Sequence, residues 1–130
     1  MRFKSKDISI SDSEFGVTIT FSEKEDIGYK PGDKIIDIPH AYILFQKTYP
    51  EDDDEYTHVE FSDYKKSGEL KDYKIDLYKN MLILFYKKEK FEILFDVDEK
   101  KFQKIKKTMM QIVNQKRKLI VHEDLEKSNE

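Results

Sequence analysis

The chain has 130 residues, of which 38% are hydrophobic and 39% charged, and its formal net charge is −3. This length suits a single domain, and the near balance of charge is unlike that of a strongly basic nucleic-acid-binding protein or an acidic polyanion mimic. The absence of cysteine excludes disulfides and thiol chemistry. Because residues 1–6 lack the apolar segment of a secretory signal, we expect a cytoplasmic protein.

The first half of the chain alternates apolar and polar residues at several places. This period of two predicts strands at residues 2–11, 15–22, 41–47 and 56–61. Residues 22–39, which contain Gly28, Pro31, Gly32 and Pro39, are typical of a long loop. Residues 63–72 are expected to form a further turn or loop.

Residues 72–113 predict a continuous unit of three strands and a helix. Tyr73 to Tyr78 alternates like a strand with one buried face, and Lys79-Asn80 is a plausible turn. Met81 to Tyr86 is apolar on both faces, as expected of a central strand, and it is too short to cross a membrane. Lys87 to Lys90 then turns the chain back into a third strand over residues 91–96.

The helix that follows is the clearest single element of the sequence. Asp96 is the predicted N-cap, with Glu99 reaching back from three residues on as in a capping box. Apolar residues recur at intervals of three and four and define one buried stripe: Phe102, Ile105, Met109, Ile112 and Val113. We expect this helix to cover the core.

The pattern as a whole predicts one α+β domain over residues 1–121. It should contain about seven mostly antiparallel strands, in a curved or two-layer sheet, with one C-terminal helix packed on it. Residues 119–121 either extend the helix or form a short edge strand, and residues 122–130 are expected to be a frayed tail. Seven strands followed by a helix is also the order of pleckstrin-homology-like barrels, although that topological analogy carries no function.

An acidic run is the most distinctive polar feature of the sequence. Five adjacent carboxylates repel one another and must face water or a cationic partner. The run lacks the spacing and glycine of an EF-hand, so it predicts either a solvated loop or a contact with a basic partner, and hardly a calcium site. The predicted partner-binding residues are Glu51, Asp52, Asp53, Asp54 and Glu55.

Other polar groups favour structural roles. His58 and Glu60 share one face of a strand and have His40 nearby, but a surface cross-strand pair explains them better than a metal site. Lys116-Arg117-Lys118 suits either favourable charge at a helix C-terminus or an anion-binding patch, and His122 falls in the expected tail. No catalytic triad order and no glycine-rich phosphate loop is present, so we expect no enzyme, no catalytic residue, no metal and no cofactor.

Three segments in order resemble the tenth immunity-protein family of bacterial polymorphic toxin systems. They are Ala-Tyr-Ile-Leu-Phe-Gln-Lys at residues 41–47, Tyr-Thr-His-Val-Glu-Phe at residues 56–61 with Ser67-Gly68 after it, and residues 93–102. The last of these reads Ile-Leu-Phe-Asp-Val-Asp-Glu-Lys-Lys-Phe, a strand that runs into a helix. The opening Phe3-Lys4-Ser5-Lys6 is similar to the short basic and aromatic first strand of that family.

This resemblance implies a small cytoplasmic protein that binds a cognate toxin domain and neutralises it, without nucleic acid or membrane as partner. The acidic run would be a natural contact for a basic toxin domain. The alternative function is a non-enzymatic pleckstrin-homology-like module that binds a peptide or an anionic headgroup. Basic side chains that converge at the open end of a curved sheet would favour this alternative. The sequence leaves the oligomeric state open.

Overall fold

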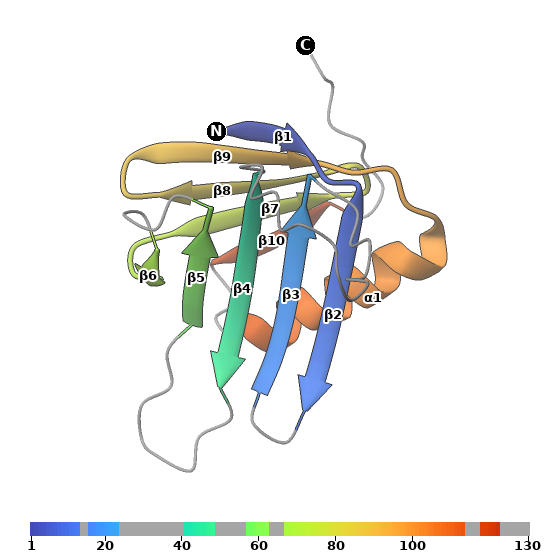
Figure 1. The fold of residues 1–130 in the computed structure, drawn as a ribbon, viewed down its shortest axis with the longest axis horizontal. Coiled ribbons are helices and arrows are strands. Elements are labelled where there is room, and N and C mark those ends of the chain that lie inside the picture. Colours follow the sequence, from blue (N-terminus) through green and yellow to red (C-terminus); the bar gives the residue numbers. More distant parts are fainter. Residues whose placement is uncertain (14–15, 24–40, 49–56, 63–66, 114–117, 123–130) are drawn as a thin grey trace, which may run out of the picture.

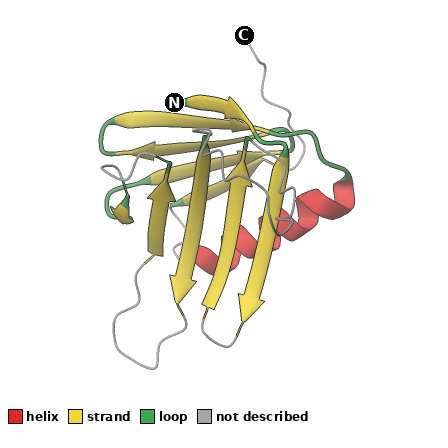
Figure 2. Cartoon of the chain, viewed as in Figure 1, coloured by secondary structure: helices red, strands yellow, loops and turns green. Residues whose placement is uncertain are grey.

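The computed structural model describes residues 1–13, 16–23, 41–48, 57–62, 67–113 and 118–122. They form two five-stranded sheets and one helix (Figures 1 and 2). The predicted α+β class, with mostly antiparallel strands and a helix near the C-terminus, is confirmed. The structure has ten strands where about seven were expected, because one predicted strand is divided and two short strands are added.

Sheet A has the strand order β1-β9-β8-β7-β10 and sheet B the order β2-β3-β4-β5-β6. The strands of one sheet run across those of the other, and the helix lies beside them (Figure 1). All neighbours are antiparallel except β1 with β9 and β10 with β7. The strands are β1 (Arg2–Lys4), β2 (Asp7–Ser13), β3 (Gly16–Ser22), β4 (Tyr42–Thr48), β5 (Thr57–Phe61), β6 (Gly68–Glu69), β7 (Lys74–Tyr78), β8 (Met81–Tyr86), β9 (Glu89–Leu94) and β10 (Leu119–His122).

The single strand predicted at residues 2–11 is divided at Ser5, where the chain passes from sheet A to sheet B. The Ser5 amide donates to the carbonyl of Leu94 in β9, whereas the next amide, that of Lys6, donates to the carbonyl of Ser22 in β3. The Ser5 hydroxyl is buried and lies 2.8 Å from the Asp7 carbonyl oxygen, to which it donates. Sequence periodicity did not reveal this corner, because Phe3 and the two isoleucines of β2 all contribute to the hydrophobic interior.

The core lies between the sheets and is rich in aromatic rings. Phe61 of β5 stacks on Phe91 of β9, with ring centroids 4.6 Å apart, and on Tyr86 of β8 at 6.1 Å. Phe21 of β3 similarly contacts Phe95, beyond β9, at 6.0 Å. Each of these contacts joins sheet B to sheet A or to the segment after it, and a fully buried Phe contributes roughly 1.5–3 kcal/mol of hydrophobic stabilisation. The expected alternation in β3 and β5 is therefore confirmed by burial.

Strand β8 is central in sheet A and is buried on both faces, as its composition predicted. Leu82 and Leu84 belong to the core, while Met81 and Ile83 are also almost fully buried. Two hairpin turns flank this strand. The turn at Lys79-Asn80 forms as expected but without the positive φ that the asparagine would tolerate, whereas Lys87 and Lys88 both adopt positive φ, at 51° and 63°.

Helix α1 (Glu99–Ile112) packs against β3, β4 and β10. The predicted stripe is confirmed, and Thr108 joins it by donating its hydroxyl back to the Lys104 carbonyl oxygen. The buried helix residues are Phe102, Ile105, Thr108, Met109 and Ile112, and Val113 is buried at the C-cap.

The predicted N-cap was wrong by two residues. Asp98, not Asp96, precedes the helix, and its Oδ1 accepts a hydrogen bond of 2.7 Å from the Lys101 amide. Asp96 lies two residues before this cap, and Asp98 itself is extended, so the Asp96 side chain is too far along the chain to cap the first turn. Within that turn, a hydrogen bond from Gln103 and the nearby charge of Lys79 lower the pKa of the Glu99 carboxyl group.

The segment after the helix returns as β10, so the edge-strand alternative is the one that the structure adopts. The strand pairs in parallel with β7, from Leu119 opposite Ile75 to His122 opposite Tyr78. His122 was assigned to the tail and given no role, which was wrong, because it is the last residue of this strand.

In the described part of the chain, no helix is long and apolar enough to span a membrane.

Candidate functional site

The acidic run predicted to bind a partner, Glu51 to Glu55, lies outside the described residues. His40, Lys116 and Arg117 do as well. The described residues present two surfaces on which polar side chains gather: the outer face of sheet B and one end of sheet A.

The outer face of sheet B, here called the polar face, carries mainly uncharged polar side chains. It consists of the residues that alternate with the buried ones in β2 to β5: Ser9, Ser11, Thr18, Thr20, Tyr42, Leu44, Gln46, His58 and Glu60. The Tyr42 hydroxyl donates to Oε2 of Glu60 at 3.0 Å, which joins β4 and β5 diagonally. The polar face therefore has fixed side chains as well as fixed strands.

His58 and Glu60 share this face as expected. His58 lies opposite Gln46 on one side and Glu69 on the other, while Glu60 is held by Tyr42. Nowhere in the described segments do three or more His, Cys, Asp or Glu residues come together as metal ligands. The cross-strand interpretation of these two residues thus agrees with their surroundings.

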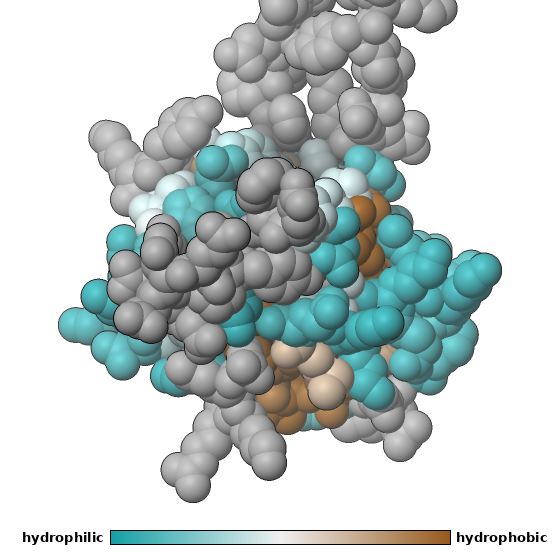
Figure 3. Space-filling model, turned by 90° about the horizontal axis from the view of Figure 1, so that it is seen from below, coloured by the Kyte–Doolittle hydropathy of each residue, from teal (hydrophilic) through white to brown (hydrophobic). Residues whose placement is uncertain are grey.

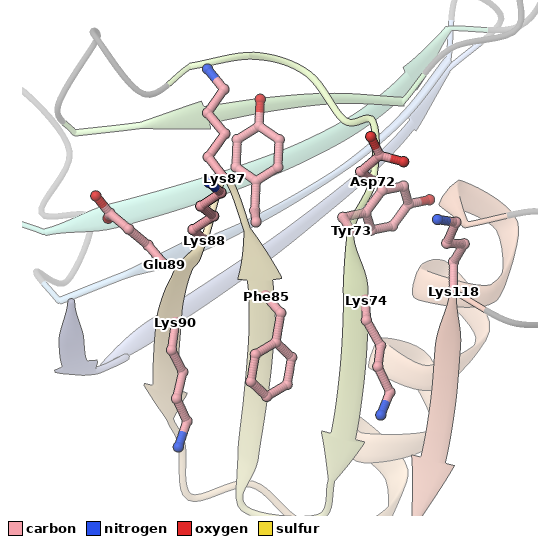
Figure 4. A pocket seen from close by; sticks show the side chains of 10 residues that line it. Asp72, Tyr73, Lys74, Phe85, Lys87, Lys88, Glu89, Lys90 and Lys118 are labelled. Atoms are coloured by element: carbon pink, nitrogen blue, oxygen red, sulfur yellow. The ribbon is translucent and has the colours of Figure 1, made fainter.

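At the other surface, side chains from sheet A surround a hollow of about 560 Å³ (Figure 4). We call it the lysine hollow. Of the ten described residues that line it, five are lysines and two are acids, in a chain whose formal net charge is −3. The lining residues are Asp72, Tyr73, Lys74, Phe85, Tyr86, Lys87, Lys88, Glu89, Lys90 and Lys118.

Strand register explains why these residues meet. Phe85 of β8 lies opposite Lys74 of β7 and opposite Lys90 of β9, so the three form one row across the sheet (Figure 4). Lys118 directly precedes β10, and its carbonyl oxygen accepts a hydrogen bond of 2.7 Å from the Ile75 amide. Lys87 and Lys88 form the turn between β8 and β9. Sequence reasoning missed the hollow because its described residues come from three separate stretches of the chain, at residues 72–74, 85–90 and 118, which strand pairing brings together.

The ammonium groups of the lysine hollow differ in their partners. Lys90 pairs with Glu92 at 2.9 Å, and Lys74 lies 3.7 Å from a carboxylate oxygen of Asp76. By contrast, Lys87 and Lys118 lie over tyrosine rings, with their Nζ atoms 5.2 and 5.4 Å from the centroids of Tyr86 and Tyr73. Such contacts hold a cation without neutralising it, so its charge stays available to an anion.

Residues with a strained, left-handed backbone conformation also line the lysine hollow. The three described non-glycine residues with positive φ are Asp72, Lys87 and Lys88, and all three line the lysine hollow. Aspartate tolerates this region, but lysine has no side-chain compensation for it. Left-handed backbone at a surface turn costs free energy that a more suitable residue would avoid, and such strain is found preferentially at functional sites.

The outer face of sheet A carries further polar side chains that pair with one another beyond the lysine hollow. His122 is within 3.2 Å of Asp76, and its ring stacks on Tyr78. Arg2 and Lys90 both pair with Glu92. These contacts satisfy the carboxylates across neighbouring strands, and they indicate a stabilising role for this region of the face.

Exposed apolar area is small on the surface that Figure 3 shows, where hydrophobic atoms form limited areas among hydrophilic ones. The large hydrophobic side chains that are exposed in the described segments belong to different elements: Met1, Phe85, Met110 and Ile120. Phe85 is notable among them because lysines flank it.

A second, smaller hollow of about 250 Å³ lies at the start of α1, where Asp98 already serves as the helix cap.

No family model matches the chain, and no match is found among the curated proteins or the solved structures with which it was compared.

Proposed function

We propose that this chain is an immunity protein that binds a cognate toxin domain and neutralises it. The observation that carries the proposal is the position of the polar residues in the segments that resemble the family. Tyr42, Gln46 and Glu60 all lie on the polar face of sheet B, although they come from two separate segments. We expect the cognate toxin domain to dock there.

The core does not need these residues. The apolar residues that alternate with them, such as Ile43 and Val59, fill the interior, and the outward positions would accept many polar residues. A pattern shared at outward positions is therefore better explained by recognition than by folding. The hydrogen bond between Tyr42 and Glu60 fixes two of the side chains in advance, which reduces the entropy lost when a partner binds.

The acidic residues at one side of the polar face also support it as the surface that binds the toxin domain. Glu60 and Glu69 lie at its β5–β6 side, and the acidic run at residues 51–55 connects β4 with β5 in the sequence. Complementary charge would steer a basic toxin domain toward this side and accelerate association. No catalytic step is part of the proposal.

The test is protection from a toxin. The gene immediately upstream, in particular the part that encodes its C-terminal region, is expressed in a bacterial host with and without this protein. We expect growth arrest that this protein relieves, and copurification of the two products. A double substitution on the polar face, Tyr42→Phe with Glu60→Gln, should weaken copurification, whereas Lys104→Gln with Lys107→Gln on the exposed face of α1 should not.

The acidic run is tested separately by changing Asp52, Asp53 and Asp54 to serine. We expect weaker toxin binding with unchanged folding. Full rescue and full copurification by this variant would remove the acidic run from the proposed interface. A harmless upstream product, or no rescue by the unaltered chain, would contradict the immunity function itself.

A second candidate function is a non-enzymatic module that binds an anionic group. It is favoured by the presence of five lysines among the residues that line one hollow at one end of sheet A: Lys74, Lys87, Lys88, Lys90 and Lys118. The two candidates use different sheets, so their tests do not depend on each other.

A further inference from the structure

We infer that the lysine hollow binds a small ligand in which an oligophosphate chain is joined to a planar ring, such as a nucleoside triphosphate. The inference gives a ligand class to the second candidate function. It is independent of toxin binding, because it concerns sheet A rather than the polar face of sheet B.

The charge of the hollow selects an anion. Its five lysines exceed its two acids by three positive charges, although the chain as a whole is negative. Among the described residues, none of the ammonium groups of Lys87, Lys88 and Lys118 is paired with a carboxylate. These cations have free donors for phosphate oxygens, with which ammonium groups form strong charge-assisted hydrogen bonds.

The kind of cation favours a phosphorylated small molecule over a protein surface. Lysine is depleted in protein–protein interfaces, where arginine, tyrosine and tryptophan are enriched. Lysine is nevertheless a common ligand of phosphate, which it binds as a point charge. A hollow of about 560 Å³ is also in the size range of small-molecule sites.

Phe85 provides a place for a ring. It is 38% exposed in the middle of the row that Lys74 and Lys90 complete. The backbones of these two lysines are separated by two strand spacings, or roughly 10 Å. A ligand that stacks a ring on Phe85 would therefore have ammonium groups on both sides for its phosphates, as Figure 4 shows for the flanking side chains.

The strained turn is the third line of support. A two-residue hairpin turn with positive φ at both positions is usually Asn-Gly, and here it is Lys87-Lys88. The lysines add two cations to the rim of the hollow at the expense of turn stability. A loss of local stability in return for ligand-binding charge is expected at a binding site.

Calorimetric titration with ATP tests the inference. We expect saturable binding of one ATP per chain, weaker binding of inorganic tripolyphosphate, and the weakest binding of adenosine. The variant Lys87→Asn with Lys88→Gly should bind ATP roughly tenfold more weakly or worse, since it loses two charge-assisted contacts. The same variant should melt at a higher temperature, so weaker binding could not be blamed on unfolding.

Two further variants complete the design. Phe85→Ser should reduce the affinity for ATP toward that for tripolyphosphate. Lys104→Gln with Lys107→Gln, which removes two charges from α1, should leave ATP binding unchanged. If the turn variant does not fold, Lys90→Gln replaces it, because Lys90 is exposed and lines the hollow without taking part in the turn.

The inference is overturned if ATP shows no saturable binding, or if the turn variant and Lys90→Gln both bind it as the unaltered chain does. Equal affinity for ATP and adenosine would contradict a role for the lysines. Binding to phosphatidylcholine vesicles that contain phosphatidylinositol bisphosphate, without binding of ATP, would show a membrane headgroup as the ligand and would also overturn the inference.

Discussion

The imidazole Nε2 of His122 lies 3.2 Å from Oδ1 of Asp76, so a side-chain contact reinforces the parallel pairing of β10 with β7. The His122 ring also stacks on Tyr78, with centroids 4.3 Å apart and planes at 6°. Asp76 has a relative exposure of 9%, and the Lys74 ammonium group lies 3.7 Å from its other carboxylate oxygen. The end of the last described strand is thus fixed through a largely buried carboxylate.

Replacing His122 by alanine should lower the free energy of unfolding by about 1–2 kcal/mol, because it removes a hydrogen bond to a carboxylate and a ring contact. Denaturant unfolding measures the change. His58→Ala is a suitable control, since His58 lies on the polar face and its replacement should change stability by no more than about 0.5 kcal/mol. Equal stability of the two variants would show that β10 contributes little to the fold.

The turn between β8 and β9 should become more stable when its lysines are replaced. Lys87→Asn with Lys88→Gly provides the residues that positive φ favours, and each strained position costs roughly 1–2 kcal/mol. We expect an increase of about 1–2 kcal/mol in the free energy of unfolding, measured by thermal or denaturant unfolding. A decrease would mean that the lysine side chains stabilise the fold more than their backbone strain destabilises it.

Substitutions at the N-cap of α1 can distinguish Asp98, the cap in the structure, from Asp96, the cap predicted from the sequence. Asp98→Ala should destabilise the protein by about 1 kcal/mol, because the Lys101 amide loses its acceptor. The matched control is Asp96→Ala, two residues away and exposed, for which we expect a change within about 0.5 kcal/mol. The reverse order in urea unfolding would restore Asp96 as the cap.

Tyr73 should make stability depend on pH in the alkaline range. Burial raises the pKa of its hydroxyl above the usual value, while a hydrogen bond with Thr57 lowers it to a smaller extent. The unfolded chain therefore loses this proton first, and the contribution of Tyr73 to stability is complete below a pH of about 10 and is lost as the pH rises through the folded-state pKa.

Comparing the unaltered chain with Tyr73→Phe isolates this effect, since the other tyrosines titrate in both proteins. The free energy of unfolding of the unaltered chain should fall more steeply above pH 10 than that of the variant. The difference at pH 7 gives the contribution of the hydroxyl while it is protonated. Parallel curves from neutral to alkaline pH would contradict the raised pKa.

The sequence was a good guide wherever a single element decides the burial of its own residues. Phe102 and Met109 face the core because a helix repeats every 3.6 residues, and Val59 and Phe61 do so because a strand repeats every two. The central position of β8 was also predictable, since a strand that is apolar on both faces must be covered on both. For the same reason the α+β class and the place of the helix in the chain were predicted correctly.

Features that depend on neighbours in space were missed. The corner at Ser5 is defined by bonds to Leu94 and Ser22, which are far from it in the sequence. The role of His122 required β10 to lie beside β7, and local sequence at residues 119–122 is equally compatible with a helix or a strand. The shift of the N-cap from Asp96 to Asp98 lies within the usual uncertainty of helix boundaries.

The class of the fold and the faces of its strands and helix follow from the local periodicity of apolar residues, and the charged surface follows from the composition. Which of these charges meet depends on how the strands pair. Lys74, Lys90 and Lys118 look like ordinary solvated lysines along the chain, and they line one hollow because the pairing of β10, β7, β8 and β9 brings them to one end of sheet A. Strand order and register are set by long-range packing, which no local pattern encodes.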